Sequence, residues 1–262
     1  MIEFSKVTGY IRWIMIRSLI EITGAKAITT FESIGRVTLF FIIGVLNIFV
    51  LPFQYGKVLD HTWFIGSKSI FVILLTGTFT GMVIGLQGYY SLVRFGSEAA
   101  LGSAVALSII RELGPVFTAI MVAARAGSAM TAEIGVMRIS EQIDALKTMH
   151  INPVRFIFSP RIVAAVISLP LLTAIFDMVG IFGGYVSGSI MLGINRYVYL
   201  DTVVSSVSFD DISGGFFKAL VFAVVITTTC CFRGYYTHLY SGFGARGVSL
   251  STTNAVVQSC IS

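Results

Sequence analysis

Long runs without a charged residue divide this sequence, and they constrain its fold more than any other feature. A run of about 20 apolar residues spans the hydrocarbon core of a bilayer as an α-helix, because each residue adds about 1.5 Å. A last, shorter run begins near Val248 and continues to the end of the chain. The internal runs are residues 37–53, 70–90, 99–124 with Arg111 and Glu112 inside, 162–195 with Asp177 inside, and 219–232.

The composition agrees with this pattern. Of 262 residues, 55% are hydrophobic and only 12% are charged, which leaves too few polar side chains to cover a soluble globule of this size. The runs have the length of helices and lack the short alternating segments of a membrane β-barrel. The sequence therefore predicts an all-α, polytopic membrane protein with a single domain over residues 1–262.

Lysine and arginine predict which runs cross the membrane. Basic residues gather before residue 37 and again over residues 125–161, and basic segments tend to stay in the cytoplasm. If the first three runs all crossed, these two segments would lie on opposite sides. Run 37–53 contains Gly44 and is closed by Pro52, as in an interfacial or re-entrant elbow. We therefore predict an elbow over residues 1–55, followed by five transmembrane helices.

Arg111 and Glu112 are adjacent ions inside the third run, and Pro115 follows them. Proline lacks an amide hydrogen and its ring presses on the carbonyl of residue 111, so we expect the helix to bend or open there. An ion at membrane depth costs a few kcal/mol, so it normally faces a cavity, a partner or a substrate. Adjacent side chains diverge by about 100° on a helix, so we expect a separate partner for each ion. The structural alternative is a mutually compensated pair that fixes helix packing.

Two other charged residues, one beside an apolar run and one inside another, have weaker interpretations. Lys218 is expected to snorkel, with its stem along apolar surface and its head in water. Asp177 lies deep in a run too long for one upright helix, which indicates a tilt or a break.

Glycines recur at every fourth position in two of the runs. Small residues at this spacing let helix backbones approach closely in lipid. Packing within the chain is favoured over a seam between subunits. The residues are Gly77, Gly81 and Gly85 in one run, and Gly180, Gly184 and Gly188 in the other.

The segment between the third and fourth runs predicts an amphipathic cytoplasmic helix over residues 131–150. Apolar Ile139, Ile143, Leu146 and Met149 recur at helical spacing, and charged residues occupy another face. Such a helix either lies on the membrane surface or docks a soluble partner.

Several reaction classes have no support in the sequence. It contains no Gly-x-x-x-x-Gly-Lys-Ser/Thr loop, so any ATP must be bound by another chain. Nucleophile elbows and His-Glu-x-x-His helices are also missing, and the three cysteines and three histidines lack metal-ligand spacing. We expect no catalytic residue, no metal site and no nucleic-acid partner.

Several stretches resemble those of one family. They are GLQGY (85–89), LSIIRELGPVFTAIMVAARAGSAMTAEIGVMRISEQIDAL (107–146), NPVRFIFSPR (152–161), VISLPLLT (166–173), GARGV (244–248) and TTNAVV (252–257). Together they resemble the MlaE permease family, the membrane subunits of phospholipid-moving ABC transporters associated with MCE proteins. The resemblance runs from about residue 70 to the end, whereas residues 1–60 resemble the family only in layout.

The resemblance implies an assembly in the inner membrane of a Gram-negative bacterium. In it a homodimer of permeases, each with an elbow and five crossings, holds phospholipid between its subunits and supports outer-membrane lipid asymmetry. Two MlaF-like P-loop ATPases, which bind the ATP and Mg, dock on the coupling helix. A hexameric MlaD-like MCE protein caps the periplasmic side, and some systems add an MlaB-like STAS-domain protein. No cofactor is implied for this chain.

The resemblance also assigns roles to residues. Arg111 and Glu112 would organise the polar part of the lipid site, and Leu86 and Leu113 would border the lipid tails. The implied lipid-binding and translocation residues are Leu86, Tyr89, Arg111, Glu112, Leu113, Pro115 and Lys218. The implied ATPase-coupling residues are Glu133, Arg138, Glu141, Asp144, Leu146 and Met149.

The sequence departs from the family at two places, and one different class of protein remains an alternative. Ser249 and Leu250 stand where the family commonly has glycine and arginine, and the final run of about fifteen residues is too short to cross a bilayer. The expectation is a truncated chain or an incomplete last helix. The alternative is a secondary transporter with its substrate site at the Arg111–Pro115 break, although the sequence shows no inverted repeat. A membrane scaffold without transport activity would leave this break unexplained.

Overall fold

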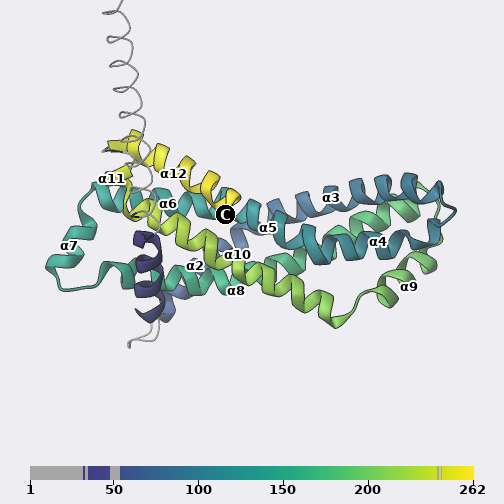
Figure 1. The fold of residues 1–262 in the computed structure, drawn as a ribbon, viewed down its shortest axis with the longest axis horizontal. Helices are drawn as coiled ribbons and strands as arrows, with labels where there is room; N and C mark the ends of the chain where they lie inside the picture. Colours follow the sequence, from purple (N-terminus) through teal and green to yellow (C-terminus); the bar gives the residue numbers. More distant parts are fainter. Residues whose placement is uncertain (1–31, 33–34, 48–53, 241, 243) are drawn as a thin grey trace, which may run out of the picture. The chain divides into compact units, whose positions relative to one another are not determined.

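The structure is a computed structural model, and it describes Glu32, residues 35–47, 54–240, Gly242 and residues 244–262. The chain divides into two compact units, Met1–Ile43 and Gly44–Ser262. Every regular element in the described residues is helical (Figure 1). The predicted elbow over residues 1–55 lies mostly outside them, and its described part contains a short apolar helix, Gly35–Leu46.

Four helices in the described residues are long and apolar enough to cross a membrane: Tyr55–Val93, Glu98–Ile139, Pro153–Met191 and Phe209–Tyr235. This confirms the all-α, polytopic prediction. The predicted fifth crossing corresponds to an 18-residue helix, Gly244–Ile261, which is not among the four. Five crossings therefore stay a prediction.

The α-helices of the second unit follow one another with short connections. They are α2 (Tyr55–Ile65), α3 (Ser67–Val93), α4 (Leu101–Ser108), α5 (Gly114–Val122), α6 (Ser128–Ile139), α7 (Gln142–Thr148), α8 (Pro153–Tyr185), α9 (Arg196–Ser206), α10 (Phe209–Tyr235), α11 (Thr237–Tyr240) and α12 (Gly244–Ile261).

Local breaks interrupt three of the four long helices. Helix α2 joins α3 at Gly66. The second long helix contains two π-helical turns, Ile109–Leu113 and Ala123–Gly127, and the third ends in another, Val186–Met191. The first of these turns confirms the predicted opening of the helix at Arg111–Pro115.

The cytoplasmic segment differs from the prediction. Instead of one amphipathic helix over residues 131–150, α6 continues the second long helix to Ile139 and α7 is a separate short helix. Glu141 between them has φ 59°, and this left-handed conformation ends the helical path. The second long helix also continues past Arg125. Its guanidinium group is used inside the fold, where Nη1 donates to the Phe64 carbonyl and to the Ser69 hydroxyl, each over 2.8 Å.

The glycine repeats join α3 to α8 inside the chain, as the sequence favoured. A Cβ atom on Gly81 would overlap the backbone of Gly180, and one on Gly85 would meet Gly184 and Ser187. The two backbones are therefore in direct contact, which only glycine permits. Gly188 packs elsewhere, against Leu101 and Tyr199.

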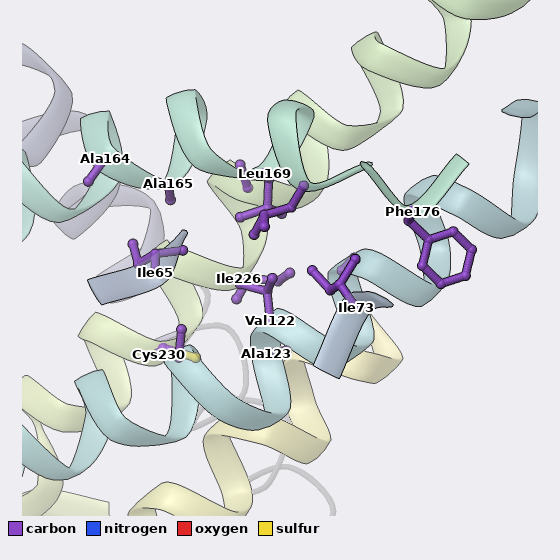
Figure 2. Close-up of a cluster of buried hydrophobic side chains, with 14 of the residues drawn as sticks. Ile65, Ile73, Val122, Ala123, Ala164, Ala165, Leu169, Phe176, Ile226 and Cys230 are labelled. Atoms are coloured by element: carbon purple, nitrogen blue, oxygen red, sulfur yellow. The ribbon is translucent and has the colours of Figure 1, made fainter. Parts of the chain in front are cut away.

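A buried apolar cluster fills the middle of the second unit (Figure 2). It takes residues from α3, α5, α8 and α10, including Ile73, Val122, Leu169 and Ile226. Phe176 of α8 stacks on Phe117 of α5 with ring centroids 6.1 Å apart. This packing holds α5, and the π-helical turn before it, against α8.

Candidate functional site

The π-helical turn Ile109–Leu113 presents two ions from the middle of an apolar helix. The side chains of Arg111 and Glu112 are 55% and 69% exposed within the single chain. Pro115, two residues after the turn, has no N–H to donate to the carbonyl of Arg111, four residues earlier. The ammonium of Lys218 on α10 donates to that carbonyl over 2.8 Å. A side chain from another helix thus supplies the hydrogen bond that proline cannot make.

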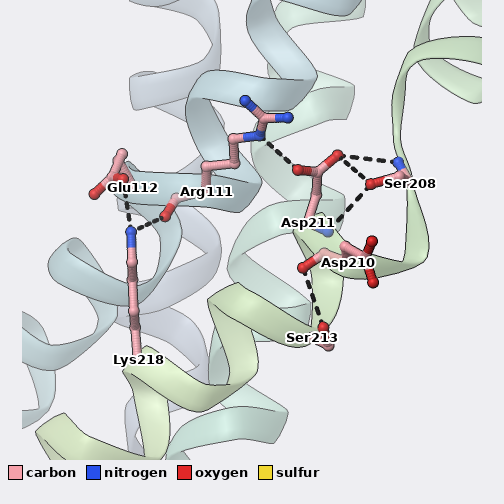
Figure 3. Close-up of polar contacts among 7 residues, drawn as sticks. All are labelled: Arg111, Glu112, Ser208, Asp210, Asp211, Ser213 and Lys218. Carbon is pink, nitrogen blue, oxygen red and sulfur yellow. Dashed lines mark hydrogen bonds and ion pairs between the residues drawn. The ribbon is translucent and has the colours of Figure 1, made fainter.

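Each ion has its own partner on α10 (Figure 3). Nε of Arg111 lies 2.6 Å from Oδ1 of Asp211, and Nζ of Lys218 lies 2.6 Å from Oε1 of Glu112. This confirms the prediction of separate partners. That Lys218 snorkels stays a prediction, and the contacts of its ammonium group are the carboxylate of Glu112 and the carbonyl of Arg111.

Asp211 is held in place by the start of α10. Ser208 is the N-cap, and its hydroxyl oxygen accepts from the amide of Asp211. In return, Oδ2 of Asp211 accepts from the amide of Ser208 over 3.0 Å. This is a capping box, which satisfies two amides that the helix leaves free. One oxygen of Asp211 therefore caps α10 while the other faces Arg111.

The charged side chains surround a cavity of about 280 Å³. A close approach of α10 to the π-helical turn shapes it, since a Cβ atom on Gly215 would lie 2.6 Å from the carbonyl oxygen of Ile110. With two cations and three carboxylates, the cavity offers partners for charges of either sign. Its lining residues are Arg111, Glu112, Asp210, Asp211, Gly214, Gly215 and Lys218.

Only some of the expected lipid-site residues meet here. Pro115 is buried beside Gly215. Leu86, Tyr89 and Leu113 do not line this cavity in the described part of the chain. Tyr89 packs against the apolar cluster instead, with its ring 5.9 Å from that of Tyr90.

The expected coupling residues divide into two groups. Glu133 pairs over 2.9 Å with Arg161 of α8, whose side chain is 4% exposed, and Arg138 pairs over 3.0 Å with Asp144 of α7. Glu141 and Met149 are exposed, and Leu146 is half-buried. The first group fastens helices to one another, and the second lies at the surface of the α7 end.

Sequence reasoning missed several contributors to these networks. Asp211 is not among the site residues expected from the sequence, although the Ser-x-x-Asp spacing from Ser208 is a signal for a helix start. Arg161 was read as the end of a loop, and nothing in its spacing points to Glu133. Asp177 was noticed without a role, and its Oδ1 is buried with no hydrogen-bond partner among the described residues.

The geometry defines a class of protein. Ions at helix breaks within membrane-spanning helices, arranged around a polar cavity, are typical of proteins that move polar or amphipathic substrates across or out of a bilayer. The chain is a multi-pass membrane protein of this class.

Comparison with known proteins gives the family. A family model described as Permease MlaE matches residues 58–262. The chain is 39% identical over 248 residues to the intermembrane phospholipid transport system permease protein MlaE of Haemophilus influenzae, covering 94% of each chain. It is 37% identical over 247 residues to a probable ABC transporter permease of Rickettsia bellii, again with 94% of each covered. The chain belongs to the MlaE permease family.

A relative in plants matches over a shorter length. The chain is 37% identical over 196 residues to the chloroplast protein TRIGALACTOSYLDIACYLGLYCEROL 1 of Arabidopsis thaliana. The match covers 75% of this chain and 55% of the plant protein.

Proposed function

We propose that this chain is the permease of an ATP-driven phospholipid transporter in the inner membrane of a Gram-negative bacterium. It exchanges lipid with a periplasmic MCE-domain protein and so supports outer-membrane lipid asymmetry. Family membership supports this proposal, as does the name of the Haemophilus relative, an intermembrane phospholipid transport system permease. The observation that carries it is the charged network of Arg111, Glu112, Asp211 and Lys218 around a cavity within the spans.

The network suits the chemistry of a phospholipid. A head group carries a phosphate, and many also carry an amine, so it needs cations and carboxylates close together. Arg111 and Lys218 offer the cations, and Glu112 and Asp210 offer the carboxylates. Exposed apolar side chains on the same helices, Val116 and Phe217 among them, provide a surface for the acyl tails.

The exposure of the two ions supports a homodimer. Charged side chains that are 55% and 69% exposed within a membrane-spanning helix cannot face lipid tails without a large cost. A second copy of the chain covers them and closes the cavity in our proposal. Phospholipid then lies between the two subunits.

The partner chains follow from the same proposal. The sequence has no phosphate-binding loop, so an MlaF-like ATPase holds the ATP and Mg and docks on α7. Helices α7 and α9 lie at opposite ends of the second unit (Figure 1), which leaves the α9 end for an MlaD-like MCE protein. An MlaB-like STAS-domain protein completes the assembly in some systems.

The test is lipid transfer by the complete complex in proteoliposomes. Arg111→Ala and Glu112→Ala should each reduce transfer at least about tenfold, because a charge-assisted hydrogen bond contributes about 1.5–3 kcal/mol. Association with the ATPase should persist. Arg94→Ala, at an exposed site after α3, should leave transfer unchanged. Uptake driven by an ion gradient in the absence of an ATPase would overturn the proposal.

A further inference from the structure

The guanidinium group of Arg138 connects three helices at the α7 end of the second unit. Arg138 lies in the last turn of α6, and its side chain is only 14% exposed. Its Nη1 donates to Oδ1 of Asp144 on α7 over 3.0 Å. Its Nε donates to Nδ1 of His238 on α11 over 3.1 Å, and its Nη2 lies 3.3 Å from Nε2 of the same ring. One side chain therefore holds both α7 and α11 against α6.

Nη1 and Nε of Arg138 both donate within the chain, and Nη2 lies beside the same histidine ring, whose Nε2 carries the hydrogen when Nδ1 accepts. The guanidinium carbon also lies 5.9 Å from the ring centroid of Tyr235 at the end of α10. The planar, forked geometry of arginine lets one group serve several acceptors at once, which a lysine ammonium does not reproduce. The guanidinium group of Arg138 therefore makes its contacts within its own chain and not with a docking partner.

The position of α7 depends on such contacts. A helix of seven residues is not stable by itself, so its place is set by the residues that anchor it. The described anchors are the buried side chain of Ile143 and the Asp144–Arg138 pair. Lys147 also pairs with Asp144, over 2.8 Å, but it belongs to α7 itself and ties it to no other helix.

We propose that Arg138 is a positioning residue that makes α7 and α11 move together. The inference rests on the proposed function, in which a partner ATPase acts on α7. Helix α11 follows α10, which carries Asp211 and Lys218 of the charged network at its other end. The tie through Arg138 and His238 therefore passes a displacement of α7 directly to the helix that shapes the cavity.

The first experiment compares two variants of α7 contacts in the complete complex with its ATPase. Arg138→Gln should leave ATPase association and ATP hydrolysis close to those of the parent chain and lower lipid transferred per ATP about tenfold. Hydrogen exchange should rise in both α7 and α11. Lys147→Gln is the matched control for the tie, because it removes the other cation from Asp144 without breaking the contact to Arg138, and hydrogen exchange of α7 and α11 should stay as in the parent chain.

A second pair of variants separates positioning from a general loss of fold. His238→Gln keeps a hydrogen-bond acceptor for Arg138 and should retain parental coupling. His238→Lys places a cation against Arg138 and should reproduce the coupling loss of Arg138→Gln, with α7 and α11 exchanging faster together.

Three outcomes overturn the inference. In the first, Arg138→Gln lowers transport, hydrolysis and association equally. In the second, only one of the two helices exchanges faster. In the third, His238→Lys couples like the parent chain. Failure of the parent chain to bind an ATPase would instead overturn the proposed function, while hydrogen exchange would still decide whether Arg138 ties α7 to α11.

Discussion

Gly114 lies directly against the carboxyl group of Asp177, so closely that a Cβ atom on Gly114 would overlap Oδ1. That oxygen is buried and has no hydrogen-bond partner in the described residues. Gly114 is the first residue after the π-helical turn that carries Arg111 and Glu112. Two helices therefore fix the position of the turn: α8 contacts it through the side chain of Asp177, and α10 contacts it through Asp211, Gly215 and Lys218.

Adding a methyl group at Gly114 tests this contact. Gly114→Ala should lower the free energy of unfolding by about 1–3 kcal/mol, because the overlap forces α5 and α8 apart. Thermal unfolding in detergent measures the change. Gly56→Ala is the control, since no atom of the described chain lies within 4 Å of the added group. Combining Gly114→Ala with Asp177→Ala should recover most of the loss, and a single variant as stable as the parent would contradict the overlap.

Exchanging the charges of Glu112 and Lys218 tests their pairing. Glu112→Lys and Lys218→Glu should each reduce lipid transfer, because each places like charges together in the cavity. The double variant restores opposite charges, and we expect a coupling energy of about 0.5–3 kcal/mol from a double-mutant cycle. Recovery should stay incomplete, because a glutamate at position 218 cannot donate to the Arg111 carbonyl. Strictly additive effects would contradict the pairing.

Removing the partner of Arg161 should destabilise the chain. Glu133→Ala leaves a guanidinium that is 4% exposed without its carboxylate. We expect a loss of about 1–3 kcal/mol, smaller than for a fully buried pair because Glu133 is half exposed. Denaturation of the purified chain measures it. Glu98→Ala, at an exposed position, should have little effect, and equal losses for the two variants would argue against a special role for Arg161.

The contact between Arg138 and His238 should depend on pH. Burial, and then the neighbouring Arg138, lower the pKa of His238 from its ordinary value of 6.5. Asp144 opposes this shift and Lys147 adds to it. A histidine with a lowered pKa stays neutral at pH 7 and accepts from Arg138, and the contact is lost only as the pH falls through that lowered value. Hydrogen exchange of α11, followed from pH 7 to progressively lower pH, should show the loosening, and His238→Gln should abolish this pH dependence.

The sequence predicted the helix break correctly because its cause is local. Pro115 lacks an amide hydrogen, and two adjacent ions cannot face the same way, so both the opening of the helix and the need for separate partners follow from a few neighbouring residues. The identity of one partner does not. Asp211 is 100 residues away from Arg111 in the chain, and no local pattern links the two residues.

The ends of the membrane helices were harder to predict because ions inside the fold resemble ions in a loop. Arg125 looked like the end of a crossing, yet it satisfies the carbonyl of Phe64 where α2 meets α3. Arg161 looked like the start of the next crossing, yet it is buried against Glu133. Hydropathy cannot distinguish a charge in water from a charge that hydrogen-bonds inside a bundle.

The direct backbone contact between Gly81 of α3 and Gly180 of α8 limits where the molecule can deform. Side chains can change rotamer to accommodate sliding, but two touching backbones have nothing to rearrange. We therefore expect α3 and α8 to move together as one rigid pair. The second long helix contains two π-helical turns, Ile109–Leu113 and Ala123–Gly127, and each exchanges regular hydrogen bonding for a looser pattern. The π-helical turn of the third long helix, Val186–Met191, begins only beyond the end of α8. We therefore expect a conformational change of this protein to be a motion of the second long helix relative to the rigid pair of α3 and α8.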